Sequence, residues 1–110
     1  MAVGDRTESR IYGPQPVSTT PGMLFGIPSG TEVVIKQVVF TNTAGAEALL
    51  YFAIGDSTVS GNRVMSALPI AAYDTIVWDT ALHLGTGEEF HGYADRAGVN
   101  ITVVGWEKEV

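Results

Sequence analysis

The chain has 110 residues, of which 45% are hydrophobic and only 16% are charged, so it predicts one folded domain and excludes a disordered polymer. It has no cysteine, which excludes disulfides, thiol catalysis and thiolate metal sites, and its net charge of −6 argues against nucleic-acid binding. Neither a signal-peptide pattern nor a run of roughly 18 apolar residues is present, so no membrane segment is expected.

The first twenty residues differ from the rest and predict an extended N-terminal arm, residues 1–20, ahead of a β-sandwich domain, residues 21–110. Two basic residues, Arg6 and Arg10, precede the stretch Gly13-Pro14-Gln15-Pro16, whose two prolines favour an extended path. The alternative is a frayed terminus. An arm that binds a partner is favoured because three apolar side chains would be costly to leave in water: Ile11, Tyr12 and Val17.

The rest of the chain alternates between short runs of high β propensity and turn residues. Thirteen glycines and five prolines interrupt most windows that are long enough for an amphipathic helix. Strands are expected over residues 23–27, 31–42, 47–54, 64–72, 74–79 with a continuation at 82–84, 89–94 and 99–106. Pro69 places the run 64–72 at a sheet edge or breaks it, because proline cannot donate to a central ladder.

The longest run, residues 31–42, does not alternate cleanly between apolar and polar side chains. Either this strand is central and covered on both faces, or a β-bulge shifts its register. About seven or eight short strands, with turn signals every 8–12 residues or so, are typical of an all-β fold. We therefore predict an antiparallel β-sandwich of jelly-roll type.

A search for catalytic chemistry finds no constellation, so no catalytic residue, cofactor or metal is expected and the chain is not expected to be an enzyme. His83 and His91 lie on either side of a glycine-rich turn, which is the wrong spacing for two metal ligands on one strand. Glu88 and Glu89 are adjacent and would point to opposite faces of a strand. A small barrel enzyme that holds a metal at the two histidines is the remaining alternative.

Aromatic residues are the better candidates for a function that depends on binding. Trp78 shares a strand face with Ile76 and is expected in the core. Trp106 follows Gly105 where the chain is expected to leave the sheet, so a position at an interface and a position in the core are both open. Tyr51 and Tyr93 are similar cases. The predicted partner-binding residues are Arg6, Arg10, Ile11, Tyr12, Val17 and Trp106.

Several segments share a pattern in a fixed order. Residues 24–43 combine a strand that ends in Pro-x-Gly-Thr, a β-branched run with a basic residue, and Asn-Thr at a turn. Further pieces of the pattern are residues 4–7, 52–56, 72–76 and 99–105. Over about residues 4–106 the chain resembles the small virion structural proteins of tailed bacteriophages, of the head-decoration and minor-tail type.

The resemblance implies a structural role. The expected function is that of a capsid decoration or cement protein, which binds the major capsid protein or another virion protein as a homo-oligomer, with a trimer as the first expectation. Such a protein is made in the bacterial host cytoplasm and ends on the virion, at the capsid surface. The low charge fraction fits a surface that a partner covers. The alternative is a tail-associated receptor- or glycan-binding module that uses Tyr73-Asp74 or the loop 55–63.

Overall fold

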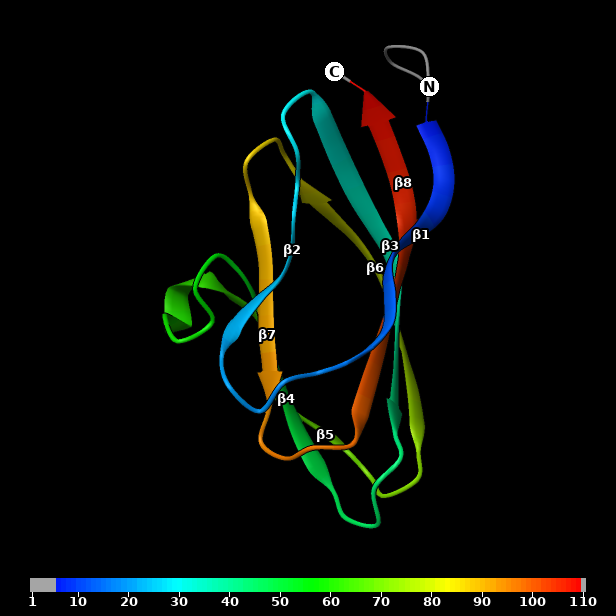
Figure 1. Ribbon diagram of the computed structural model, residues 1–110, viewed down its shortest axis with the longest axis vertical. Coiled ribbons are helices and arrows are strands. Elements are labelled where there is room, and N and C mark those ends of the chain that lie inside the picture. The colour runs from blue at the N-terminus through cyan, green and yellow to red at the C-terminus, as the bar shows by residue number, and fades with distance from the viewer. Residues whose placement is uncertain (1–5, 110) are drawn as a thin grey trace.

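The β-branched and aromatic runs form strands, and the glycine- and proline-containing segments between them form turns (Figure 1). The computed structural model describes residues 6–109. Its elements are β1 (Arg6–Pro16), β2 (Gly22–Gly26), β3 (Thr31–Asn42), β4 (Ala48–Ile54), the short 3₁₀ turn η1 (Ser60–Asn62), β5 (Arg63–Ile70), β6 (Thr75–Leu84), β7 (Glu89–Ala94) and β8 (Val99–Glu109). No helix in this described part of the chain is long and apolar enough to cross a membrane.

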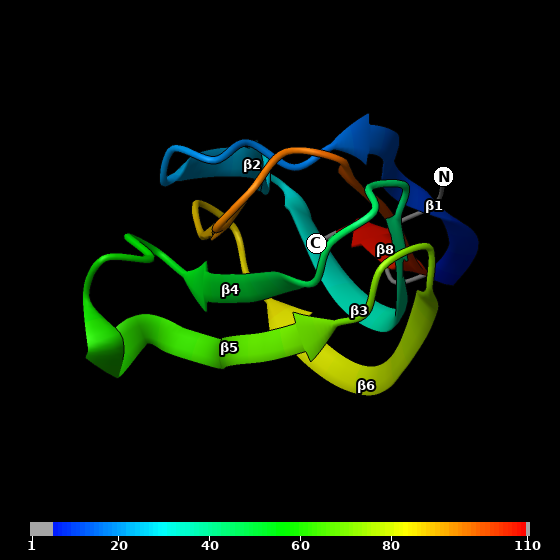
Figure 2. The same cartoon turned by 90° about the horizontal axis from the view of Figure 1, so that it is seen from below.

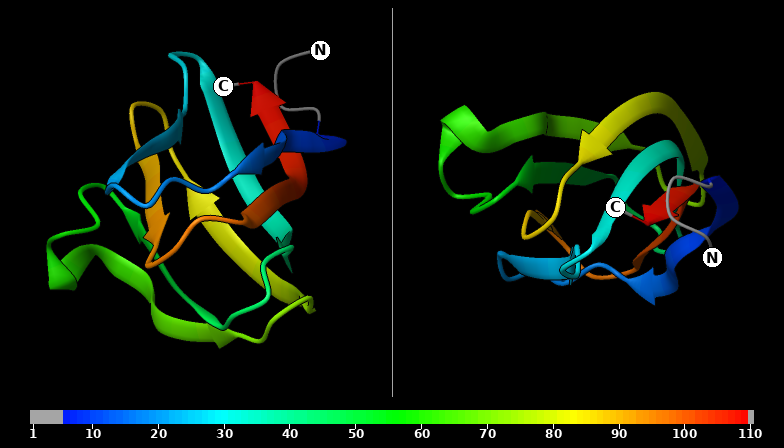
Figure 3. Two further views of the ribbon diagram at one scale, coloured as in Figure 1. Left: turned by 60° about the horizontal axis from the view of Figure 1, so that its bottom comes forward. Right: turned by 90° about the horizontal axis from the view of Figure 1, so that it is seen from above.

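The strands form two four-stranded antiparallel sheets. Sheet A has the order β1-β8-β3-β6, and sheet B has the order β2-β7-β4-β5. The right-hand view of Figure 3 shows sheet A as blue β1, red β8, teal β3 and yellow β6. This order, in which the first strand pairs with the last and the second with the next to last, is that of a jelly roll. The predicted fold class is therefore confirmed.

The core lies between the two sheets (Figure 2). Phe40 of sheet A contacts Phe52 of sheet B at a ring distance of 5.2 Å, and Phe52 stacks on Phe90 at 5.6 Å. All three rings are fully buried. Each buried aromatic removes a large apolar area from water, so these rings stabilise the core, and the contact between Phe40 and Phe52 joins the two sheets. Trp78 packs against the same core, as predicted.

A β-bulge in β3 explains the irregular alternation of that run. The buried positions change from 33 and 35 to 38 and 40, because the register shifts between Ile35 and Gln37 against both neighbouring strands. Lys36 and Gln37 are therefore both left outside the core. Gly105 lies opposite Ile35, and a Cβ there would collide with the carbonyl oxygen of Val34. The backbones approach so closely at the bulge that only glycine fits.

The segment predicted as an arm is extended, and residues 6–16 of it pair with β8 at the edge of sheet A. The Tyr12 ring lies 5.4 Å from the Phe25 ring of β2. Val17 is only 3% exposed and belongs to the core. The described part of the segment thus has a place in the sandwich. Residues 1–5 lie outside the described range, and the division of the chain at residue 20 stays a prediction.

Most predicted strand boundaries lie within two residues of the observed ones, and two strands differ by more. The expected pieces 74–79 and 82–84 form one continuous strand, β6. The last strand runs on to Glu109, so Trp106 lies within β8 and not where the chain leaves the sheet. β5, which contains Pro69, is an edge strand, as that proline predicts.

Candidate interaction surface

Part of the outer face of sheet A carries very little charge. Three rows of residues lie in register across β6, β3 and β8, on the side away from the core. We call them the outer patch: Thr75, Thr41 and Asn100; Val77, Val39 and Thr102; Asp79, Gln37 and Val104. Only Asp79 is charged among these nine residues, whereas a solvated surface carries about a quarter to a third charged residues. Val77, at the middle of the β6 side, is 52% exposed. Such a face is typical of a surface that a partner covers.

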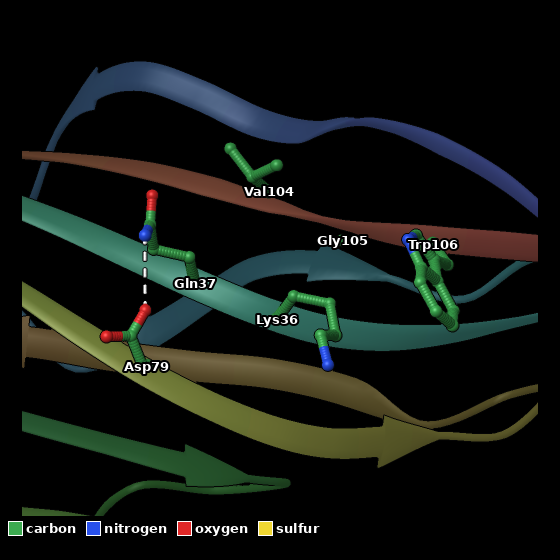
Figure 4. A pocket seen from close by; sticks show the side chains of 6 residues that line it. All are labelled: Lys36, Gln37, Asp79, Val104, Gly105 and Trp106. Atoms are coloured by element: carbon green, nitrogen blue, oxygen red, sulfur yellow. Dashed lines mark hydrogen bonds between the residues drawn. The ribbon is translucent and has the colours of Figure 1, made fainter.

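A shallow cavity of about 300 Å³ borders the outer patch, with Trp106 at one end and Asp79 at the other (Figure 4). The amide nitrogen Nε2 of Gln37 donates a hydrogen bond of 3.1 Å to Oδ1 of Asp79. At the other end, Nζ of Lys36 lies 5.3 Å from the centre of the Trp106 ring, within cation–π range. The cavity offers an aromatic face, an amide and a carboxylate, which are groups suited to holding a polar side chain of a partner.

A small group of charges follows at the end of the sheet beyond the cavity. Oε2 of Glu32 lies 3.2 Å from Nε2 of His83, and Oε1 of Glu32 lies 3.5 Å from Nζ of Lys108. The hydrogen bond with His83, helped by the charge of Lys108, lowers the pKa of Glu32 below its ordinary value. The group is partly exposed, so it contributes to the charge pattern of this face more than to stability.

On the outer face of sheet B, Arg63 contacts two tyrosines and a loop. The rings of Tyr51 and Tyr93 stack at 4.6 Å, and the guanidinium carbon of Arg63 lies 5.0 Å from the centre of the Tyr51 ring. Arg63 also donates a 3.4 Å hydrogen bond to the hydroxyl of Tyr93 and a 3.0 Å bond from Nε to the carbonyl of Ser57. The two tyrosines are half-buried. Their role here is to hold the loop 55–62 on the sheet.

The two histidines lie on different sheets. His83 is on β6 beside Glu32, and His91 is on β7 with its Nε2 2.9 Å from Oε1 of Glu89. No cluster of three histidine, cysteine or acidic side chains that could hold a metal ion occurs in the described range. The histidines of the alternative enzyme hypothesis are therefore not brought together.

The structure divides the predicted partner-binding residues into two groups. Arg10 is exposed at the edge of sheet A, opposite Val104, and Trp106 is half-buried on the outer face of β8. The three apolar residues of the set, Ile11, Tyr12 and Val17, pack against or within the core. Arg6 begins β1 opposite Lys108, and its side chain lies outside what the structure describes. Only Arg10 and Trp106 are thus seen at the outer face, and the binding role of the set stays a prediction.

Sequence reasoning missed the part of the surface on β3 and β6, which includes Gln37, Val77 and Asp79. The broken alternation of residues 31–42 was the available signal, since a bulge places two successive side chains on one face. The contribution of β6 gave no local signal, because its place at the edge of sheet A depends on long-range pairing.

One loop residue is unusually exposed. Tyr73, in the turn between β5 and β6, is 76% exposed and has a φ of 58°. Its backbone N–H donates a 3.2 Å hydrogen bond to the carbonyl of Ala44, which fixes the turn against the neighbouring loop. A bulky residue held at positive φ, with its ring in solvent, is a feature that often accompanies binding sites.

No protein-family model matches the sequence, and no curated protein matches it. Similar solved structures exist. A structure of Bacillus endospore appendages, which form a family of disulfide-linked pili, has a TM-score of 0.61 and 8% identity over 99% of this chain and 92% of that chain. The likeness is one of fold. A structure of the T13 particle of infectious bursal disease virus has a TM-score of 0.50 and 10% identity over 98% of this chain and 29% of that chain.

Proposed function

We propose that this chain is a structural subunit of a tailed-phage virion, which works by binding protein surfaces and does not catalyse a reaction. The observation that carries the proposal is the outer patch, a nearly uncharged part of the face of sheet A with Val77 half exposed on its β6 side. The resemblance in sequence and the jelly roll, a fold also found in part of a viral particle protein, support it. An acidic body suits solubility at high local concentration.

In this proposal the outer patch rests on the capsid surface, where the protein decorates or cements the major capsid protein. Several copies act together, and a trimer remains the first expectation. Because the chain has no cysteine, its copies must associate without disulfides, unlike the pili of the similar spore appendages. The contacts between copies must therefore come from backbone pairing and packing.

The experiment combines mass measurement with binding to particles. The purified chain is expected to elute at three times its 11.7 kDa and to bind purified phage particles that lack it. Val77→Glu places a charge in the outer patch and should weaken particle binding by at least about tenfold. Met23→Glu is the matched control, because Met23 is 55% exposed on β2 of sheet B. A monomer that binds no virion component would contradict the proposal.

A position of the protein at the phage tail is favoured by one observation, the exposed Tyr73 beside Asp74. An aromatic ring next to a carboxylate is a combination that binds sugars, so the same virion protein could act at the tail as a receptor- or glycan-binding module. Imaging of particles that carry the tagged protein separates head from tail. Loss of host binding on Tyr73→Ala, with particle binding intact, would favour the tail.

A further inference from the structure

Each sheet of the sandwich ends in two edge strands, and three of the four are short or contain proline. β1 contains Pro14 and Pro16 and two register shifts, and β2 has only five residues and a register shift. β5 contains Pro69, a positive φ at Ala67 and two register shifts. Such features hinder pairing with another chain where they occur.

β6 is the least interrupted of the four edges. It has ten residues without proline or glycine, and exposed positions alternate with less exposed ones along the whole strand. Its one register shift against β3 falls between Asp79 and Leu82. Its outer edge presents backbone N–H and C=O groups that no other described strand covers. A long, partly apolar edge without proline is a template for an added strand.

The register across sheet A shows which strand could be added. All three pairs in the sheet are antiparallel, so β1 and β6, at its two edges, run in opposite directions. A second copy placed beside the first in the same orientation therefore brings its β1 antiparallel to β6. Residues 6–10 of β1 precede its prolines and keep an unbroken register with β8, so this half of the strand is regular enough to pair on its other side.

The charges at the two edges are complementary in this arrangement. One row of paired residues crosses the whole sheet: Arg10, Val104, Gln37 and Asp79. A neighbouring copy without axial shift continues this row, so that its Arg10 follows Asp79 of the first copy. Both residues are exposed, and the second carboxylate oxygen of Asp79 is not used by the bond from Gln37. The opposite charges favour this register over a slipped one.

We propose that copies of this chain join edge to edge, with β6 of one copy pairing with β1 of the next and Asp79 facing Arg10 of the neighbour. The inference rests on the proposed function, whose self-association it explains. The contact uses two different surfaces, so it closes into a ring, such as the expected trimer, or continues as an open assembly. The outer patch of every copy then lies on the same side of one continuous sheet.

Cysteine pairs test this contact directly, because the natural chain has no cysteine. Within one chain Arg10 and Asp79 are separated by three strand spacings, about 14 Å, and a disulfide needs Cα atoms within about 7 Å. In the Arg10→Cys and Asp79→Cys double variant every disulfide must therefore join two chains. Mild oxidation is expected to give covalent oligomers on a non-reducing gel.

A control pair moves one cysteine along the same strand. Arg10→Cys with Thr75→Cys shifts the second position by about 13 Å along β6 and should give few cross-links. Charge reversal is a second measurement. Arg10→Asp and Asp79→Arg should each weaken self-association about fivefold, and the double variant should restore it.

The outcomes separate this contact from the proposed function. Cross-links specific to Arg10 and Asp79 support the proposal. Suppose that the natural chain forms oligomers and binds particles. If the Arg10 and Asp79 cysteine pair then gives no cross-link, or if the Arg10 and Thr75 pair cross-links equally well, the edge contact is wrong and the proposed function stands. If the natural chain is monomeric at every concentration and binds no particle, both fail.

Discussion

Asn42 is the polar residue on which one end of the sandwich depends, and its replacement gives the sharpest stability prediction. The side chain is fully buried at the end of β3. Its amide nitrogen lies 2.8 Å from the carbonyl oxygen of Ala46 and 3.2 Å from those of Ile70 and Ala71, and its amide oxygen accepts a 3.0 Å bond from the N–H of Ala44. One side chain thus joins the turn after β3 to the turn after β5.

Asn42→Ala leaves these backbone groups without a partner inside the protein. The amide nitrogen has two hydrogens to donate and the amide oxygen accepts one bond, so about three bonds are lost at once. At about 1 kcal/mol for each, the free energy of unfolding should fall by about 3 kcal/mol. That is a large part of the roughly 5–15 kcal/mol that stabilises a domain, and it corresponds to a drop in melting temperature of about 12 °C. Urea unfolding followed by tryptophan fluorescence measures the change, with an unaltered m value expected.

Two further variants make the result specific to the buried amide. Asn100→Ala removes an amide that is partly exposed in the outer patch, and its effect should stay within about 0.5 kcal/mol. Asn42→Asp keeps the shape but places a carboxylate against carbonyl oxygens, which raises its pKa in the folded state. Its destabilisation should therefore ease as the pH falls. A loss below about 1 kcal/mol for Asn42→Ala would refute the bonding described above.

Three other changes follow from the same structure. Gly105→Ala should lower the free energy of unfolding, measured in urea, by about 3 kcal/mol, because a Cβ would collide with the carbonyl oxygen of Val34. A decrease under about 0.5 kcal/mol would contradict the close approach at the bulge. Ser57→Ala removes a buried hydroxyl that has no hydrogen-bond partner, so the melting temperature should stay the same or rise slightly. A clear fall in the melting temperature would mean that the hydroxyl does form a hydrogen bond. The pKa of Glu32 should lie below 4.5 in an NMR titration and rise in the His83→Gln variant. Since folding lowers this pKa, its stabilising contribution is present above about pH 4.5 and is lost as the pH falls through the lowered value; a pKa that does not respond to the variant would disprove the contact with His83.

The sequence by itself determined the local structure of this protein. Strands and turns follow from side-chain shape and from the positions of glycine and proline, which act within a few residues. Pro69 correctly placed its strand at an edge, and the broken alternation of residues 31–42 correctly admitted a bulge. The count and spacing of strands were also enough for the sandwich and its jelly-roll type.

Only the tertiary structure decided which residues meet. Val17 looked like part of a binding arm, but it is buried because the segment after β1 passes over the end of the core. Asp79 carried no signal in the sequence, yet sheet pairing places it in one row with Arg10 from the other end of the chain. Sheet order joins residues that are distant along the chain, and no local preference encodes it. The surface of this protein is therefore a property of its fold, although most of its strands can be predicted from the local sequence.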